Sequence, residues 1–418
     1  MNRNDRAIAG FTMAGHLMVH TLELSIPILM TVWLVEFSAT SATLGTVVAV
    51  GYGLFGVGAL PGGILVDRFG SRELIVACLF GMGLSFLLLA FAPGIGGITL
   101  ALAVWGIAAS VYHPAGLALI SNGAEKRGSV FAYHGMAGNV GIAFGPFATA
   151  LLLVALDWRT VSMALAVPAL VAAIVGLAAE FDETAAVDPV ADGGDAASPS
   201  VDSLGGFLVA SKRLFTAGFL IVFVLVLFNG LYYRGILTFL PELLGDFLDS
   251  LVDVAPDEGI GPIPDGPVGR EFDLEGSLYA GLLAIGIGGQ YVGGRLTDAI
   301  EPERGVAIML VGLVVIALLF IPASGTLPTL LGISVALGFV LFAMQPLTQA
   351  TIAKYSPPEH RGLSFGYTYL AIFGIGALGA SLAGAALTYG SPALVFVLLA
   401  GFAAVALSLA VLLIVRDW

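Results

Sequence analysis

Apolar segments of about 20 residues recur along the whole chain, separated by short polar breaks. Segments 73–92 and 393–415 contain almost no side chain that favours contact with water. About 20 apolar residues in a helix cross a hydrocarbon core of ~30 Å, and backbone amides in lipid must find partners within their own segment. The alternating apolar and polar positions of an outer-membrane barrel are absent from the sequence. The pattern therefore predicts an all-α membrane protein.

The apolar runs and their breaks predict twelve transmembrane helices. The predicted spans lie near 7–35, 41–66, 73–92, 95–122, 129–156, 158–179, 215–240, 277–297, 305–322, 328–353, 363–388 and 391–415. An acidic segment separates the first six spans from the last six. We therefore expect an N-terminal six-helix bundle in 1–179, an acidic cytoplasmic linker in 180–211 and a C-terminal six-helix bundle in 212–418.

Lys and Arg residues gather on alternate loops of this topology. If the N-terminus is inside, the outer loops contain only Arg159 and Arg270. The cytoplasmic segments then contain Arg3, Arg6, Arg68, Arg72, Lys126, Arg127, Lys212, Arg213, Arg295, Arg304, Lys354, Arg361 and Arg416. Because cytoplasmic loops carry the excess of basic residues, this bias predicts a multi-pass cell-membrane protein with both termini in the cytoplasm.

The amino-acid composition supports a membrane protein and argues against several classes of soluble protein. The chain is 58% hydrophobic and 11% charged, whereas soluble proteins carry about 25% charged residues. Cys78 is the only cysteine, so an intrachain disulfide or a thiolate metal cluster is impossible. The sequence contains no Walker phosphate loop and no soluble-enzyme constellation. We expect no enzymatic activity, no cofactor and no metal, and a first helix that is retained rather than cleaved as a signal peptide.

The net charge of −13 is concentrated outside the predicted spans, in 180–202 and 242–275. Dense carboxylates could hold hydration at high salt, or these could be two ordinary disordered acidic loops. Neither alternative suggests a nucleic-acid partner; the expected partners are the lipid bilayer and a small-molecule substrate.

The two halves repeat short motifs in the same order. The sequence GILVD at 63–67, after the second span, recurs as GRLTD at 294–298, after the eighth. His113-Pro114 in the fourth span corresponds to Gln345-Pro346 in the tenth. These matches indicate a parallel duplication, which is a known repeat of secondary transporters.

The first of these motifs carries a resemblance to a known family. The run from Gly63 through Asp67, Arg68 and Gly70 to Arg72 resembles the cytoplasmic loop signature of the major facilitator superfamily. The resemblance implies two six-helix bundles that rock around a midplane cavity, with the aspartate at a helix end and the basic residues as a gate latch. The second copy keeps Asp298 but loses the trailing basic pattern.

Other motifs narrow the resemblance to efflux proteins. Gly141, Gly145 and Pro146 in the fifth span resemble the core of the drug-antiporter motif of that superfamily. The segments 112–115 (YHPA), 138–141 (GNVG) and 233–241 (YRGILTFLP) are similar to fosmidomycin-resistance-type efflux proteins. This similarity implies efflux of a small molecule by proton antiport.

Ionisable residues inside predicted spans are costly and should face a cavity or a partner. His16, His20 and Glu23 lie at i, i+4 and i+7, on one stripe of the first span. Together with His113 they are our candidates for proton coupling, although the same groups could only brace neighbouring helices. His134 is expected near the cytoplasmic end of the fifth span, at the membrane interface.

Arg234, in the seventh span, is the one basic residue that cannot be placed in a loop. It could bind an anionic substrate, pair with a carboxylate such as Glu23, or extend to the outer interface. Neutral hydrogen-bonding residues complete the set of substrate-binding candidates: Tyr233, Asn139, Asn229, Gln345 and Gln349.

These observations favour a secondary active transporter that works by alternating access, exports a small molecule by proton antiport and functions as a monomer. Proton-coupled uptake of a small organic anion is the alternative within transporters. A membrane sensor that has lost transport is the alternative from another class.

Overall fold

The computed structural model describes residues 1–187, 204–251, 267–357 and 361–416, and the regular elements in these ranges are helices. The first half contains α1 (Arg3–Glu36), α2 (Ser41–Phe69), α3 (Ser71–Ala90), α4 (Ile95–Ser110), α5 (Tyr112–Gly123), α6 (Arg127–Leu153) and α7 (Trp158–Leu177). The second half contains α9 (Ala217–Leu251), α10 (Pro267–Ala299), α11 (Pro302–Ala323), α12 (Leu327–Lys354), α13 (Arg361–Tyr369), α14 (Leu378–Tyr389) and α15 (Pro392–Val415).

Eleven candidate membrane spans are found among the described residues, and the all-α membrane fold is confirmed. Helices α4 and α5 together form one span, as do α13 and α14 with the π and 3₁₀ turns between them. The remaining predicted span, 277–297, lies within α10. Helix α9 continues through Pro241 to Leu251, beyond the predicted end at 240, which is consistent with the tolerance of membrane helices for proline.

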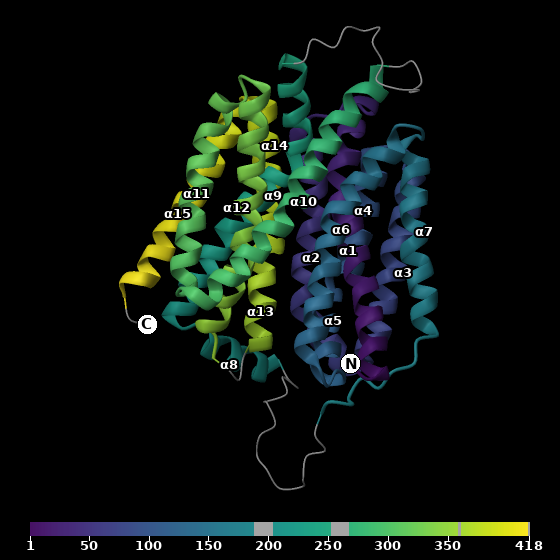
Figure 1. Cartoon of the computed structure of the whole chain (residues 1–418). Helices are drawn as coiled ribbons and strands as arrows, with labels where there is room; N and C mark the ends of the chain where they lie inside the picture. The colour runs from purple at the N-terminus through teal and green to yellow at the C-terminus, as the bar shows by residue number, and fades with distance from the viewer. Residues whose placement is uncertain (188–203, 252–266, 358–360, 417–418) are drawn as a thin grey trace.

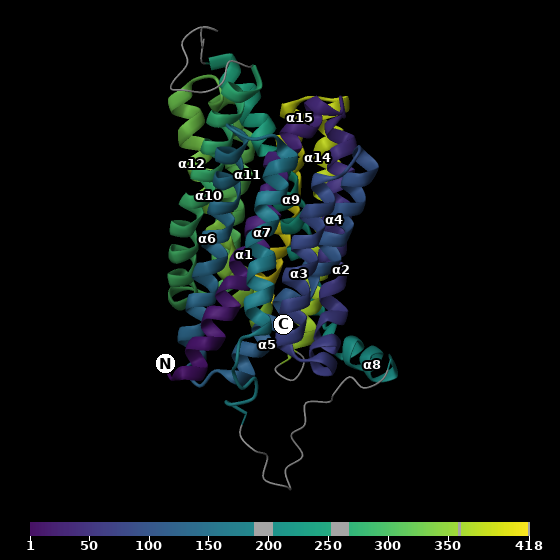
Figure 2. The ribbon, with the colours of Figure 1, turned by 90° about the vertical axis from the view of Figure 1, so that its right-hand side faces the viewer.

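The two halves stand side by side, and both chain ends lie at the same end of the bundle (Figure 1). In the first half, α1 packs on α6, α3 on α7 and α2 on α4; in the second, α10 packs on α12 and α11 on α15. The halves meet chiefly where α2 contacts α14 and α6 contacts α10 (Figure 2). The predicted division at 180–211 stays a prediction, and residues 188–203 of that segment lie outside the described residues.

Helix α8 (Leu204–Leu214) is an element that the hydropathy pattern did not predict. It lies at the end of the bundle that carries the termini (Figure 1). The hydroxyl of Tyr367 on α13 donates to Ser211 Oγ over 2.8 Å and ties α8 to the second half. The helix was missed because its sequence, LGGFLVASKRL, has a short apolar face rather than an apolar run.

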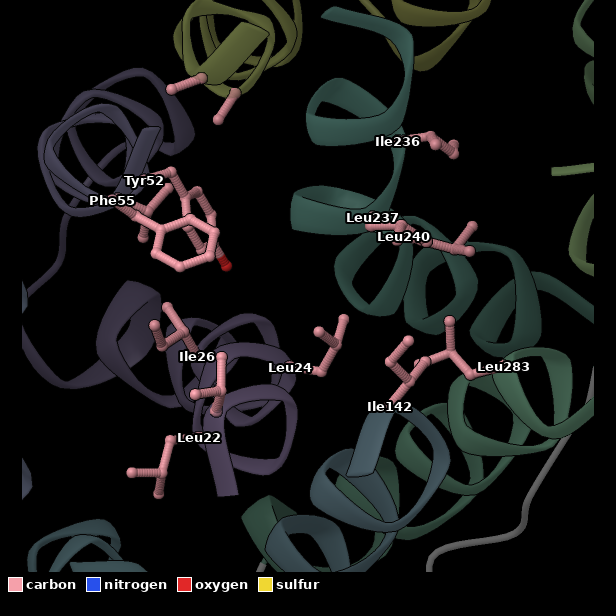
Figure 3. Close-up of a cluster of buried hydrophobic side chains, with 14 of the residues drawn as sticks. Leu22, Leu24, Ile26, Tyr52, Phe55, Ile142, Ile236, Leu237, Leu240 and Leu283 are labelled. Atoms are coloured by element: carbon pink, nitrogen blue, oxygen red, sulfur yellow. The ribbon is translucent and has the colours of Figure 1, made fainter. Parts of the chain in front are cut away.

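Apolar side chains fill the centre of the interface between the halves. Leu24 of α1 faces Leu237 and Leu240 of α9, and Ile142 of α6 lies near Leu283 of α10 (Figure 3). These residues are at most 5% exposed. Since lipid tails are as apolar as leucine, contacts of this kind stabilise the interface mainly through close packing.

Candidate functional site

A cavity of about 1530 Å³ lies between the two halves. It is lined from α1, α2, α5 and α6 on one side and from α8, α9, α10, α12, α13 and the π turn after α13 on the other. The cavity extends from Glu23 and Tyr233 to Arg68, near the end of α2, and Phe207, in the helix Leu204–Leu214 (α8). Helix α8 lies at the end of the bundle that carries the termini (Figure 1).

The opposite end of the interface is closed by contacts between α2 and the second half. Ser41 Oγ donates to Glu242 Oε1 over 2.7 Å, and the Ala42 amide donates to Thr388 Oγ1 over 2.8 Å. Gly45 allows the backbone of α14 to approach, because a Cβ there would come within 2.5 Å of the Ala380 carbonyl oxygen. Among the described residues, the interface is thus open toward one face and closed toward the other.

An ion pair joins the halves at the closed end of the cavity. Arg234 Nη2 of α9 donates to Glu23 Oε1 of α1 over 2.5 Å, and the two side chains are 2% and 1% exposed. The guanidinium lies 3.9 Å from the ring centre of Tyr52 and 5.1 Å from that of Phe373. Three roles were considered for Arg234, and in the structure it pairs with Glu23. Arg234 is not among the residues that line the cavity.

The predicted stripe on α1 forms a continuous chain of polar contacts. His20 Nδ1 lies 2.7 Å from Glu23 Oε2, and His20 Nε2 lies 3.1 Å from His16 Nε2. His16 Nδ1 lies 2.7 Å from the His134 carbonyl oxygen on α6. All four residues, His16, His20, Glu23 and His134, line the cavity.

The expectation that His134 is interfacial was wrong. Its side chain is buried, and its ring stacks on His16 with 3.9 Å between ring centres. The stacking depends on Gly138, where a Cβ would come within 2.4 Å of His16 Cε1. A small residue one turn after His134 was the signal in the sequence that α1 and α6 approach closely there.

His113 lies in the cavity wall where α4 gives way to α5. Helix α4 ends at Ser110, four residues before Pro114, whose nitrogen has no hydrogen to donate to that turn. The His113 ring stacks on Tyr369 at 5.3 Å, and its Nε2 is buried with no hydrogen-bond partner in the described structure. Ring nitrogens of His16, His20 and His113 lie within 4.8 Å of one another, so these residues could hold a metal ion.

The second half supplies the wall opposite the histidines. Gln290 Nε2 donates to Gln345 Oε1 over 2.6 Å, which joins α10 to α12. The predicted candidates Tyr233, Asn139, Asn229, Gln345 and Gln349 all line the cavity. Among the described lining residues of the second half, none is charged.

The ring contact of Arg68 and the side-chain hydrogen bonds of Arg72, two described residues of the loop signature, lie within the first half. Arg68 lines the cavity and lies over the Phe69 ring at 5.3 Å. Gly70 turns the chain at φ +84°, and Arg72 donates to the carbonyl oxygens of Gly176 and Leu177 at the end of α7. The side chain of Asp67 lies outside the described residues. Gly63 lines the cavity and Asp298 is exposed.

Glu183 is a residue of this region that the sequence did not single out. Its carboxylate accepts from the amides of Ser71 and Arg72 over 2.9 and 3.3 Å, at the start of α3. The open donors of a helix N-terminus favour a carboxylate at this position. No local spacing predicts the contact, because 112 residues separate Glu183 from Ser71.

The antiporter-like motif packs α6 onto α1. A Cβ at Gly141 would come within 2.4 Å of the Leu17 carbonyl oxygen, and one at Gly145 within 2.4 Å of the Thr21 carbonyl oxygen. Pro146 is buried beside them. In this conformation the motif holds the helix that carries the histidine stripe.

Comparisons with known proteins agree on a family. A family model described as Major Facilitator Superfamily matches residues 10–255 and 268–417. Over 108 residues the chain is 39% identical to the puromycin resistance protein pur8 of Streptomyces alboniger, a match that covers 25% of this chain and 22% of that protein. A second match, 29% identical over 125 residues, is to the uncharacterized MFS-type transporter YqjV of Bacillus subtilis and covers 30% of it.

Solved structures match over nearly the whole length. The nucleoside transporter NupG aligns with a TM-score of 0.77 at 12% identity, covering 97% of this chain and 99% of that chain. A bacterial homolog of the human lysosomal transporter Spinster, in an inward-facing and unoccupied conformation, aligns with a TM-score of 0.70 at 14% identity, covering 99% and 96%. At these identities the likeness concerns the fold.

Proposed function

Because the chain belongs to the Major Facilitator Superfamily, we propose that it is a secondary active transporter that exports a small organic molecule in exchange for protons. The observation that carries this proposal is the cavity between the halves, which is open toward one face and closed toward the other. Rocking of the two halves would expose the same cavity to each side of the membrane in turn.

The proposed orientation places both termini in the cytoplasm, because basic residues are concentrated at that end of the bundle. The cavity then faces inward, and the contacts of Ser41 and Ala42 form the outer closure. One chain encloses the whole cavity, so we propose that a monomer is the functional unit in the cell membrane.

Export is supported by the similarity to a puromycin resistance protein. The chemistry of the cavity agrees with an uncharged or weakly charged organic substrate, because amide and aromatic side chains dominate the wall of the second half. Uptake of an organic anion is less well supported, since Arg234 is already neutralised by Glu23 and covered by Tyr52.

The Glu23–Arg234 pair gives the mechanism a link between the halves. The pair joins α1 to α9 at the closed end of the cavity, so separation of the halves at that end must lengthen or break it. Breaking a buried ion pair is costly, because each charge loses its partner while it is still shielded from water. We propose that this pair favours the inward-facing state.

The proposal is tested with purified protein in sealed vesicles that contain a pH-sensitive dye. Puromycin serves as the first probe, because a similar protein confers resistance to it. We expect uphill movement of the probe under an imposed proton gradient, accompanied by proton flow in the opposite direction. Empty vesicles and vesicles treated with a proton ionophore are the controls. Probe movement that does not respond to collapse of the gradient would exclude proton exchange.

A further inference from the structure

Two histidines of α1 are held so that the same ring nitrogen of each faces the other. His16 Nδ1 lies 2.7 Å from the His134 carbonyl oxygen, which only accepts, so Nδ1 carries the hydrogen. His20 Nδ1 lies 2.7 Å from the carboxylate of Glu23, whose other oxygen accepts from Arg234. In their neutral forms both imidazoles therefore present a lone pair at Nε2.

The two Nε2 atoms lie 3.1 Å apart. Two lone pairs at that distance repel each other unless a cation lies between them or beside them. A single shared proton would satisfy this contact, but it would leave a third nitrogen without a partner. That nitrogen is Nε2 of His113, which is buried in the same wall and has no hydrogen bond in the described structure.

A metal ion bound by one ring nitrogen of each of the three histidines would remove the repulsion between the two Nε2 atoms. We propose that His16, His20 and His113 bind a divalent transition-metal ion such as Zn²⁺, with a fourth position directed toward the cavity. Their ring nitrogens lie within 4.8 Å of one another, and the first two are at i and i+4 on one helix face. In a tetrahedral site with Zn–N bonds of about 2.0–2.1 Å, neighbouring nitrogens lie about 3.4 Å apart.

The surroundings of His16 and His20 match those of metal-bound histidines in proteins. Metal-bound histidines commonly donate their other N–H to a carboxylate or a backbone carbonyl, which fixes the ring and its tautomer. His20 has the carboxylate of Glu23 in this role, and His16 has the His134 carbonyl. Tyr369 stacks on His113 and holds that ring from the second half.

Access and ligand preference follow from the position of the site. All three histidines line the cavity, so an ion or a substrate group can reach them from the open face. Imidazole ligands suit Zn²⁺, Cu²⁺ and Ni²⁺ better than Mg²⁺ or Ca²⁺, which prefer oxygen. A three-histidine site with an open fourth position would let water or an electron-donating group of the substrate complete the coordination. This site goes beyond the proposed export function and does not depend on it.

The test uses full-length protein in lipid nanodiscs, stripped of metal with a chelator and then titrated with Co²⁺. We expect one Co²⁺ per chain, the absorption spectrum of tetrahedral coordination, and displacement by Zn²⁺. His113→Phe keeps a ring against Tyr369 and removes one ligand. The Co²⁺ affinity of this variant should fall by more than the roughly 10- to 100-fold that is lost when a hydrogen-bond partner of a metal ligand is removed.

His134→Phe is the matched control, because it keeps the stacked ring and the backbone carbonyl that accepts from His16. It should bind Co²⁺ as the wild type does. The proposal is overturned if wild-type protein binds no Co²⁺ or Zn²⁺, or if the two variants bind equally well or equally poorly. If His113→Phe fails to fold, X-ray absorption of the wild type with Zn²⁺ decides: three histidine nitrogens support the site, and an oxygen-only shell excludes it.

Discussion

The two walls of the cavity come from repeated halves but differ in their chemistry. The first half contributes His16, His20, Glu23 and His113, all titratable, whereas the second half contributes carboxamides such as Gln345 and Gln349. The difference is clearest at matching positions, where His113 precedes Pro114 and Gln345 precedes Pro346. The two halves therefore share a helical arrangement, but the first half supplies most of the ionisable groups of the cavity and the second half supplies neutral hydrogen-bonding groups.

The backbone of the two walls differs as well. The fourth span is broken at Val111, between α4 and α5, whereas α12 continues from Leu327 to Lys354 through Pro346. In the second half the irregular segment lies instead in the eleventh span, where a π turn covers Leu370–Gly374. Gly56 of α2 packs on that turn, since a Cβ there would come within 1.9 Å of the Gly374 nitrogen. Such turns often lie at functional sites.

The largest effect on stability is expected at the ion pair between Glu23 of the first half and Arg234 of the second. Glu23→Ala leaves Arg234 as a buried cation without its partner, so the free energy of unfolding should fall by about 3–5 kcal/mol. Arg234→Met in the same background should recover part of the loss, because it removes the unpaired charge. Chemical unfolding of the single and double variants in detergent measures both effects. Purely additive losses would show that the two side chains do not stabilise each other.

A smaller effect, on substrate affinity, is expected in the cavity wall formed by the second half, which contains Gln345. Gln345→Leu removes the acceptor of the 2.6 Å hydrogen bond from Gln290 and one polar group of the cavity. If this wall recognises the substrate, affinity should fall by about 1–3 kcal/mol, roughly 5- to 150-fold, while the Glu23–Arg234 contact persists. Equilibrium binding and unfolding measured on the same sample separate the two roles. A variant that binds normally but unfolds more easily would reassign Gln345 to helix packing.

The smallest effect is expected outside the cavity. Glu183→Ala removes the carboxylate that accepts from two amides at the start of α3, and should cost about 0.5–2 kcal/mol of stability. Transport should be nearly unchanged, since the contact lies within the first half. Glu180→Ala, in the same short segment, is the control and should have little effect on stability. Strong inhibition of transport by Glu183→Ala would show that this contact takes part in gating.

The fold could be predicted from the sequence because three features agreed on the same arrangement of spans. These are the length of the apolar segments, the polar breaks between them and the placement of Lys and Arg. The apolar runs placed the spans, and GILVD at 63–67 with GRLTD at 294–298 indicated the repeat. The ends of α9 and α10 were harder to predict, because both helices extend beyond their apolar portions.

The sequence indicated which residues could belong to the candidate site, but not which of their side chains contact each other. The i, i+4 and i+7 spacing placed His16, His20 and Glu23 on one face of α1, since that spacing depends on helix geometry alone. Which neighbour each side chain meets depends on how separate helices pack. The stacking of His134 on His16 and the partner of Arg234 therefore needed the structure.

Alternating opening of the two ends of the interface can be measured as distances between spin labels on protein in nanodiscs. Cys78 is buried, which favours selective labelling of introduced cysteines. One label pair is placed at Thr43 and Tyr389, exposed residues at the closed end; the other is at Phe69 and Gly366, near the open end. If the ends open alternately, conditions that lengthen the first distance shorten the second. Two distances that stay fixed, or that lengthen together, under an imposed pH change and added probe would contradict alternating opening.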